Sequence, residues 1–279
     1  MIHFINCKGR LLDFSEPRVM GILNVTPDSF FDGGKYVLVE QAVEHAARML
    51  AEGATIIDVG GMSSRPGAAL ISVEEEINRV VPVIAAIQSA LPEAIIAVDT
   101  WRSEVAQQAV AAGASIINDI SAGTLDDKMF PIMAELNVPV VLMHMKGTPA
   151  TMQLSPLYED VVTETLDFLM ARVSLLQGMG VNDIIVDPGF GFGKTILHNY
   201  ELLRRMRELS TVLQCPLLAG LSRKSMIYKV LGTEPASAIN GTSVLNMVAL
   251  DQGAQILRVH DVKEAIEVIQ LWKMLHSAG

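Results

Sequence analysis

The sequence has 279 residues, of which 50% are hydrophobic and 19% charged, and its formal net charge is −10. This composition excludes general disorder, and the negative charge argues against a nucleic-acid surface or an anionic membrane, since both attract clustered Lys and Arg. Two distant cysteines, Cys7 and Cys215, favour a reducing, cytoplasmic setting without a disulfide framework. No apolar run reaches the roughly 18 residues of a spanning helix, and the start lacks signal-peptide order.

The chain opens on a predicted β-hairpin. The segments IHFIN (2–6) and RLLDF (10–14) flank a CKG turn. We expect residues 1–18 to close the bottom of the domain formed by the rest of the chain.

From residue 19 onward one unit recurs, in which a short apolar strand ends on polar residues and leads into a helix. In residues 39–54, for example, Ala42, Ala46 and Met49 repeat at helical spacing and Gly53 marks the end of the helix. The eight predicted strands cover residues 19–25, 55–61, 94–100, 115–121, 139–145, 183–189, 216–222 and 255–261.

These strands are apolar along nearly their whole length, which is typical of parallel strands covered on both faces. Eight consecutive strand-helix units predict an α/β fold of the (β/α)8 TIM-barrel class, with residues 1–279 forming a single domain. An open doubly wound sheet is the structural alternative.

The ends of the predicted strands carry most of the chemistry in the sequence. Any one of these residues could simply cap the following helix. In a barrel, however, all eight strand ends meet at one mouth, where a group of buried polar side chains is costly unless they bind each other or a ligand. The residues are Asn24, Asp58, Asp99, Asn118, Asp119, His144, Asp187, Ser222, Arg223, Lys224, Arg258 and His260.

The strand-end residues divide by chemistry into two expected arcs. Asp99, Asn118 and Asp187, with Lys224 nearby, suit a flat heterocycle that carries amino and carbonyl groups. Asn24, Arg258 and His260 suit a phosphate or pyrophosphate. His144 could equally be a hydrogen-bonded core histidine.

Three glycine-containing loops come after strands. TPDSFFDGGKY (26–36) and GGMSSRPGA (60–68) have the composition of lids over a charged ligand, although each could be a surface loop. IIVDPGFGFGKT (184–195) matches the spacing of neither a phosphate loop nor a dinucleotide-binding loop. We therefore expect its Lys194 and Thr195 only to begin the next helix.

Taken in order, these segments resemble the dihydropteroate synthase family over nearly the whole chain from Val19. The motifs that carry the resemblance are GILNVTPDSFFDGG, GGMSSRPGA, IAVDTWR, IINDIS, LMHMKGTP, IVDPGFGFGKT, GLSRKS and ILRVHDV.

The resemblance implies an enzyme that joins 6-hydroxymethyl-7,8-dihydropterin pyrophosphate to 4-aminobenzoate, with Mg²⁺ and as a homodimer. It implies pterin binding by Asp58, Asp99, Asn118, Asp187 and Lys224, and pyrophosphate binding by Asn24, Ser64, Arg65, Arg258 and His260. Aminobenzoate would contact Phe30, Ser64, Pro66, Phe192 and Ser225, and Asn24 would touch the metal. The expected catalytic set is Asp32, Asp99, Asp187, Lys224, Arg258 and His260.

The second lid departs from the family pattern Gly-Gly-Glu-Ser-Thr-Arg-Pro-Gly, because Met62 replaces Glu and Ser64 replaces Thr. This departure leaves open a pterin-binding module without turnover. A pterin-binding barrel that passes a methyl group to a corrinoid protein is a second alternative, although it would not need a pyrophosphate site. A third would use Lys224 as a Schiff-base nucleophile.

Overall fold

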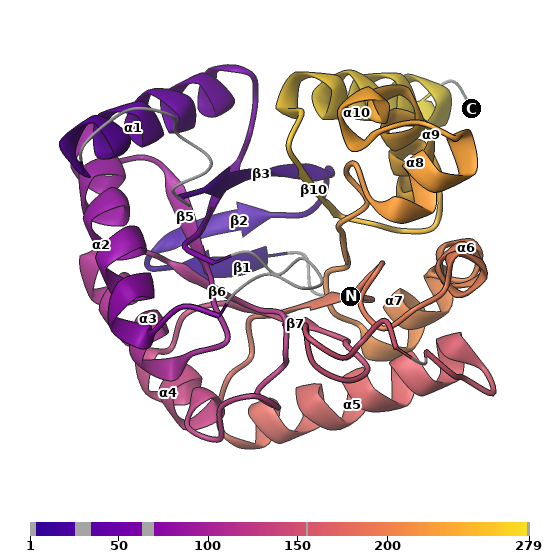
Figure 1. Ribbon diagram of the computed structural model, residues 1–279, viewed down its shortest axis with the longest axis horizontal. Helices are drawn as coiled ribbons and strands as arrows, with labels where there is room; N and C mark the ends of the chain where they lie inside the picture. Colours follow the sequence, from indigo (N-terminus) through magenta and orange to yellow (C-terminus); the bar gives the residue numbers. More distant parts are fainter. Residues whose placement is uncertain (1–3, 26–34, 63–69, 155, 278–279) are drawn as a thin grey trace.

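A computed structural model of the chain describes residues 4–25, 35–62, 70–154 and 156–277. Eight parallel strands form one sheet in the order β8-β7-β6-β5-β4-β3-β10-β9 (Figure 1). A parallel bridge between Val186 and Leu217 joins its two end strands and closes the ring. The predicted barrel is thereby confirmed, and the open sheet is wrong. The strands are β3 (Arg18–Asn24), β4 (Ile56–Gly60), β5 (Ile95–Asp99), β6 (Ile116–Asp119), β7 (Val140–Met143), β8 (Ile184–Asp187), β9 (Leu218–Ala219) and β10 (Ile256–Val259).

Helices come after every strand and surround the ring (Figure 1). The predicted alternation of strand and helix holds, but two α-helices follow β8, and two α-helices with a short 3-10 helix (Pro235–Ser237) between them follow β9. The helices are α1 (Lys35–Ala51), α2 (Val73–Ala90), α3 (Ser103–Ala112), α4 (Met129–Leu136), α5 (Val161–Gly178), α6 (Ile196–Arg204), α7 (Arg207–Leu213), α8 (Ser225–Leu231), α9 (Ile239–Asp251) and α10 (Val262–Ser277).

Side-chain caps fix where several helices begin. The Ser72 hydroxyl accepts a hydrogen bond from the Glu75 amide at the start of α2, and the Asp160 carboxylate accepts two amides at the start of α5. Thr195 and His198 form a reciprocal capping box at α6, which confirms that Thr195 begins a helix. These caps satisfy amides that a helix leaves without internal partners.

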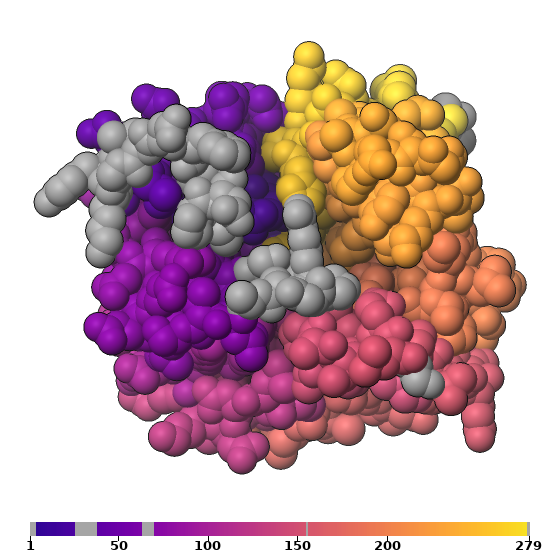
Figure 2. Space-filling view, in the orientation of Figure 1, coloured from indigo at the N-terminus to yellow at the C-terminus, as the bar shows by residue number. Residues whose placement is uncertain are grey.

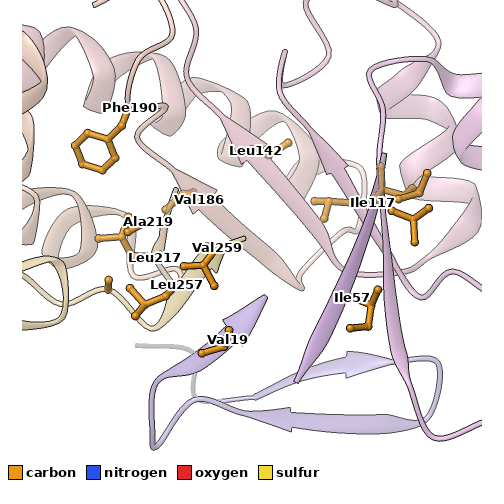
Figure 3. Packing of buried hydrophobic residues seen from close by; sticks show 14 of the residues in the cluster. Val19, Ile57, Ile117, Leu142, Val186, Phe190, Leu217, Ala219, Leu257 and Val259 are labelled. Atoms are coloured by element: carbon orange, nitrogen blue, oxygen red, sulfur yellow. The ribbon is translucent and has the colours of Figure 1, made fainter. Parts of the chain in front are cut away.

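The outward side chains of the strands form the main hydrophobic core against the helices. Figure 3 shows members of this cluster on several strands, including Val19, Ile57, Ile117 and Leu257. In Figure 2 the indigo start of the chain lies beside its yellow end, as expected from the pairing of β3 with β10. The strand-to-helix interface thus makes one continuous core around the ring.

The inward side chains near the beginning of each strand form a second cluster, the lower cluster, which the N-terminal hairpin covers. Strands β1 (Phe4–Cys7) and β2 (Arg10–Asp13) pair in antiparallel fashion, and Lys8 and Gly9 take positive φ in the turn between them. This turn geometry suits the twist of a tight hairpin. The cluster comprises Ile5, Cys7, Leu12, Phe14, Met20, Ile56, Ala97, Ile116, Val141, Ile185, Leu218 and Ile256.

Both cysteines are buried free thiols. Among the described residues, no helix combines the length and the hydropathy that crossing a membrane requires.

Two neighbouring leucines of β2 test the role of the hairpin. Leu12 is 4% exposed in the lower cluster, whereas Leu11 is 71% exposed. We expect Leu12→Ala to lower the free energy of unfolding by about 2–5 kcal/mol, because it removes buried methyl groups and leaves a cavity. Leu11→Ala should change it by about 0.5 kcal/mol or less. Urea denaturation of both variants measures the difference, and equal losses would contradict the packing described.

Candidate active site

The inner face of the barrel changes from apolar to polar over two residues along each of several strands. Side chains two apart on a strand share a face. Ile56 in the lower cluster is therefore followed on the inner face by Asp58, Ile116 by Asn118, and Ile185 by Asp187. The same step leads from Ala97 to Asp99 and from Ile256 to Arg258. These five of the predicted strand-end residues therefore converge on one mouth.

Arg258 binds two of the acids at this mouth. Its Nε donates to Asp58 Oδ2 at 2.6 Å and its Nη2 to Asp99 Oδ2 at 2.6 Å. Asn118 Nδ2 also donates to Asp58 Oδ2, at 3.1 Å. The long side chain of Arg258 thus reaches across to the acids of β4 and β5, so this residue of the expected anion arc also contacts the expected ring arc.

Burial and neighbouring charges together determine the pKa values of Asp99 and Arg258. Burial raises the pKa of Asp99 to about 7, while the Arg258 guanidinium pulls that pKa back down and the neighbouring carboxyl of Asp58 adds to the rise. For Arg258, burial lowers the pKa, but Asp58 and Asp99 outweigh it and keep the group charged. Among the described residues, the fully buried Asp58 Oδ1 has no hydrogen-bond partner. An unpaired buried acceptor at the mouth suits a ligand that brings a donor.

Asp187 and Lys224 form the second charged group. Burial raises the pKa of Asp187, and the Lys224 ammonium opposes this rise. Burial lowers the pKa of Lys224 to about 8, opposed by Asp187. A Cβ at Gly220 would lie 3.6 Å from Lys224 Nζ and 3.8 Å from Asp187 Oδ2, so both charged groups lie beside the chain just after β9.

The loop after β8 fixes both partners. Asp187 Oδ1 accepts the Gly189 amide at 2.7 Å, and Lys224 Nζ donates to the Phe190 carbonyl at 2.5 Å. The same ammonium lies 4.9 Å from the centre of the Phe192 ring. Ser225 comes directly after Lys224 as the first residue of α8.

An apolar cluster lies beside the polar group. Met143 and Met145, on and just after β7, are 3% and 7% exposed, and Phe192 packs against the same cluster. Flexible thioethers adapt to the face of a flat ring, and aromatic rings can stack on it. The other members are Trp101, Ile120, Leu125 and Met152.

The remaining predicted anion-binding residues lie on β3 and after β10. A Cβ at Gly60 would lie 3.7 Å from Asn24 Oδ1 and 3.6 Å from Asp99 Oδ2, so the Asn24 amide oxygen is close to the acid cluster. The His260 imidazole faces the buried Ser222 hydroxyl, with 3.0 Å from its Nδ1 to Oγ. Ser222 Oγ also accepts a hydrogen bond from the His260 backbone amide at 3.2 Å, so it contacts both the backbone and the imidazole of His260.

Comparisons with known proteins agree on one family. The family described as "Pterin binding enzyme" matches residues 20–260. The dihydropteroate synthase of Escherichia coli (strain K12) is 46% identical over 273 residues, which are 97% of this chain and 96% of that protein. The chain belongs to the dihydropteroate synthase family.

Solved structures of this family superpose on almost the whole chain. The dihydropteroate synthase of Xanthomonas albilineans with 4-aminobenzoic acid is 42% identical, has a TM-score of 0.92 and matches 99% of each chain. The same organism's enzyme in complex with 7,8-dihydropteroate is 40% identical, with a TM-score of 0.88 and 98% of each chain matched.

Several residues predicted from the family resemblance fall where the structure gives no description. Phe30, Asp32, Ser64, Arg65 and Pro66 lie outside the described residues. Met62, at the family's usual glutamate position, is described and is 9% exposed.

Sequence reasoning missed other members of the site. Lys194, expected only to begin a helix, is buried against the β8 loop, and its partner is His144, for which the sequence allows either a catalytic or a core role. The strand-end position of Ser222 gives no sign of its contact with His260. The only signal for Lys194 is its position directly after a glycine-rich loop, because the carbonyls that it binds have no sequence signature.

Removal of Arg258 tests the charge balance at the mouth. Arg258→Met leaves Asp58 and Asp99 buried without their cation, so we expect the free energy of unfolding at pH 8 to fall by about 3–5 kcal/mol. Because the raised pKa of Asp99 rises further without Arg258, protonation relieves the unpaired charge as the pH falls. The deficit should therefore shrink between pH 8 and pH 5.

Arg223→Met is the matched control. Arg223 pairs with Asp261, and the two side chains are 27% and 15% exposed. Its loss should cost less, about 1–3 kcal/mol, because it leaves one partly exposed carboxylate without a cation, whereas the loss of Arg258 leaves two. Denaturation of both variants across this pH range gives the comparison, and an Arg258→Met deficit that grows toward pH 5 would contradict the assignment.

Proposed function

We propose that this chain condenses 6-hydroxymethyl-7,8-dihydropterin pyrophosphate with 4-aminobenzoate, giving 7,8-dihydropteroate and pyrophosphate. The observation that carries the proposal is the inner-face group of Asp58, Asp99, Asn118 and Asp187 beside Lys224. These side chains offer acceptors, an amide and a cation around an apolar wall, which is the complement of a flat ring with amino, ring N–H and carbonyl groups. Membership of the synthase family favours this reaction over methyl transfer to a corrinoid protein.

The ring would be held by hydrogen bonds that single out its polar edge. Asp187 accepts from the ring's donors, and Lys224 donates to its carbonyl. Asp58 Oδ1, which no described residue satisfies, accepts a further donor directly or through water. Met145 and Phe192 cover the flat faces.

The proposed chemistry breaks one C–O bond and forms one C–N bond. The bonding pair of the C–O bond leaves with pyrophosphate, and the cation that develops on the methylene carbon delocalises into the pterin ring. The lone pair of the aromatic amine then attacks this carbon and the amine loses a proton. Asp99 and Asp187 stabilise the cationic ring, while Arg258 and His260 stabilise the departing anion. Because the lysine and acids act through charge and position, no protein nucleophile is required.

Magnesium fits the donors present on one side of the mouth. Asn24 Oδ1 is a hard oxygen close to Asp99 Oδ2, beside Gly60. Among the described residues, no cluster of three His, Cys, Asp or Glu could hold a metal by itself. Mg²⁺ usually combines one or two protein oxygens with substrate phosphates and water, so Asn24 would suffice as the anchor. When bound, the ion would supply positive charge to the pyrophosphate oxygens.

Two variants at opposite ends of one barrel strand test the proposed function. Asp187→Asn should leave the fold intact and lower the turnover number by at least about 100-fold, because it removes a preorganised electrostatic partner of the pterin ring. Asp183 precedes the same strand and accepts the Asn6 amide of the hairpin at 3.0 Å. Asp183→Asn should turn over normally. Dihydropteroate formation measures both, and a wild-type chain that forms none would overturn the proposal.

We also propose that the protein is a cytoplasmic homodimer. Its buried, unpaired thiols suit a reducing compartment. Exposed apolar side chains gather on α8, α9 and α10, and α9 packs against both of the other helices. Neighbouring exposed apolar side chains of this kind are typical of a protein interface. They are Val230, Leu231, Val244, Val248, Leu271, Met274 and Leu275.

Charge placed on this face should separate the subunits. Val244 and Val248 are 55% and 36% exposed on α9. We expect the wild-type chain to behave as a dimer in size-exclusion chromatography with light scattering, and Val244→Arg/Val248→Arg to behave as a monomer, because buried unpaired charge opposes association. Leu175→Arg, at a residue 50% exposed on α5, should remain dimeric. A double variant that stays dimeric would place the interface elsewhere.

A further inference from the structure

The lysine that ends the glycine-rich loop after β8 is one of the most enclosed charged groups of the described chain. Lys194 is 3% exposed. Its Nζ donates to the Gly189 carbonyl at 2.9 Å and the Phe192 carbonyl at 3.2 Å, and lies 2.8 Å from His144 Nδ1. The His144 carbonyl is a fourth neighbour at 3.5 Å. An ammonium has three protons, so these acceptors satisfy it fully.

His144 is built to accept this ammonium. Burial, together with the charges of Lys194 and Lys146, lowers the pKa of His144 to about 2, so the ring is neutral. The ring packs edge-on against Phe168 and lies 3.5 Å from the Thr165 hydroxyl. With Nδ1 next to an ammonium that has no acceptor capacity, the ring proton belongs on Nε2. His144 is therefore an acceptor fixed in place by α5.

Every carbonyl of the loop 189–193 accepts a hydrogen bond from a side chain. In addition to the two that bind Lys194, Gly191 O accepts from Gln153 Nε2 at 2.6 Å and Gly193 O from the Tyr158 hydroxyl at 2.9 Å. A Cβ at Gly189 would lie 1.9 Å from the His144 carbonyl, so only glycine permits this approach. The loop is thus pressed against the chain that leaves β7.

The opposite side of this loop faces the ligand-binding mouth. Its remaining carbonyl, Phe190 O, receives Lys224 Nζ at 2.5 Å, and the Phe192 ring lies 4.9 Å from the same nitrogen. Its first amide, at Gly189, binds Asp187 Oδ1. One short loop therefore connects a buried lysine behind it to three groups of the candidate site in front.

We propose that Lys194, held by His144, is a positioning residue that fixes the β8 loop so that Phe190, Phe192 and Asp187 hold Lys224 and the pterin ring in register. The inference rests on the proposed function for the identity of the ligand. It assigns a role to the Gly-Phe-Gly-Lys segment, whose residues resemble those of a nucleotide-binding loop although the spacing of its glycines does not match one.

The charges around Lys194 agree with this role. Burial lowers the pKa of Lys194 to about 7, Asp187 raises it and Lys224 lowers it further. In return, Lys194 is among the cations that oppose the burial-driven rise in the pKa of Asp187. Below about pH 7, where Lys194 is protonated, both ammonium groups therefore oppose the rise in the pKa of Asp187 and favour its ionised, hydrogen-bond-accepting form.

The test separates position from stability by measuring ligand binding to folded protein. Lys194→Met keeps the length of the side chain but removes the ammonium. We expect the dissociation constant for 6-hydroxymethyl-7,8-dihydropterin pyrophosphate, measured by calorimetry, to rise about 10-fold or more, as for the loss of a charge-assisted hydrogen bond. Lys146→Met is the matched control. Lys146 lies in the same segment after β7 as His144, but its side chain is 45% exposed and pairs with Glu164. This variant should bind the ligand normally.

Chemical rescue gives a readout that general loss of stability would not produce. Lys194→Ala leaves space for the missing three carbons and nitrogen, so added propylammonium should restore binding in a saturable manner, whereas propanol should not. If Lys194→Met does not fold, His144→Leu decides, because it removes one acceptor and keeps the lysine. It too should raise the dissociation constant.

The outcomes also distinguish this inference from the proposed function. A wild-type chain that does not bind the pterin pyrophosphate refutes the proposed function. A wild-type chain that binds, together with unchanged binding in Lys194→Met or, failing its folding, in His144→Leu, overturns the positioning role alone. Weakened binding without rescue by propylammonium would also overturn it.

Discussion

Three carboxyl groups share the mouth of this barrel because a guanidinium lies among them. Arg258 bridges Asp58 and Asp99 at 2.6 Å each, and its charge also acts on Asp187. Removing such groups from water costs free energy that their mutual attraction only partly returns. An apolar inner layer would make a more stable barrel, as the lower cluster beneath it illustrates. The acid cluster is therefore best explained by binding, at some expense of stability.

The sequence predicted the barrel because its strands are apolar, evenly spaced and separated by helices, and it predicted most of the mouth because strand ends must converge. It did not predict the direction that a long side chain takes. Arg258 was assigned with His260 to the anion arc, and the structure adds that its guanidinium contacts the acids of β4 and β5. The burial of Lys194 was also missed, since its partners are mostly backbone carbonyls, which every residue carries.

The glycine-rich loop after β8 shows why a sequence motif can resemble a nucleotide-binding loop and have another role. Glycines commonly allow a phosphate to approach the backbone closely, but here they allow the close approach of the chain segment after β7. Gly193 illustrates the point, because its Cβ would lie 2.4 Å from the Lys146 carbonyl. The loop becomes a stiff platform with a buried ammonium on one side and a ligand-facing ammonium on the other. Rigid placement of a few polar groups is the main requirement for a reaction that depends on charge and orientation.

The barrel is joined most thinly between β8 and β9. In the described chain, β9 spans only Leu218–Ala219, and the one bridge across to β8 pairs Val186 with Leu217, the residue before β9. Asp187 ends β8, Lys224 lies in the chain after β9, and the two charged groups attract one another. Their attraction thus helps to hold together the two barrel strands that share the fewest backbone hydrogen bonds. A ligand that contacts both groups would therefore also stabilise the barrel at this joint.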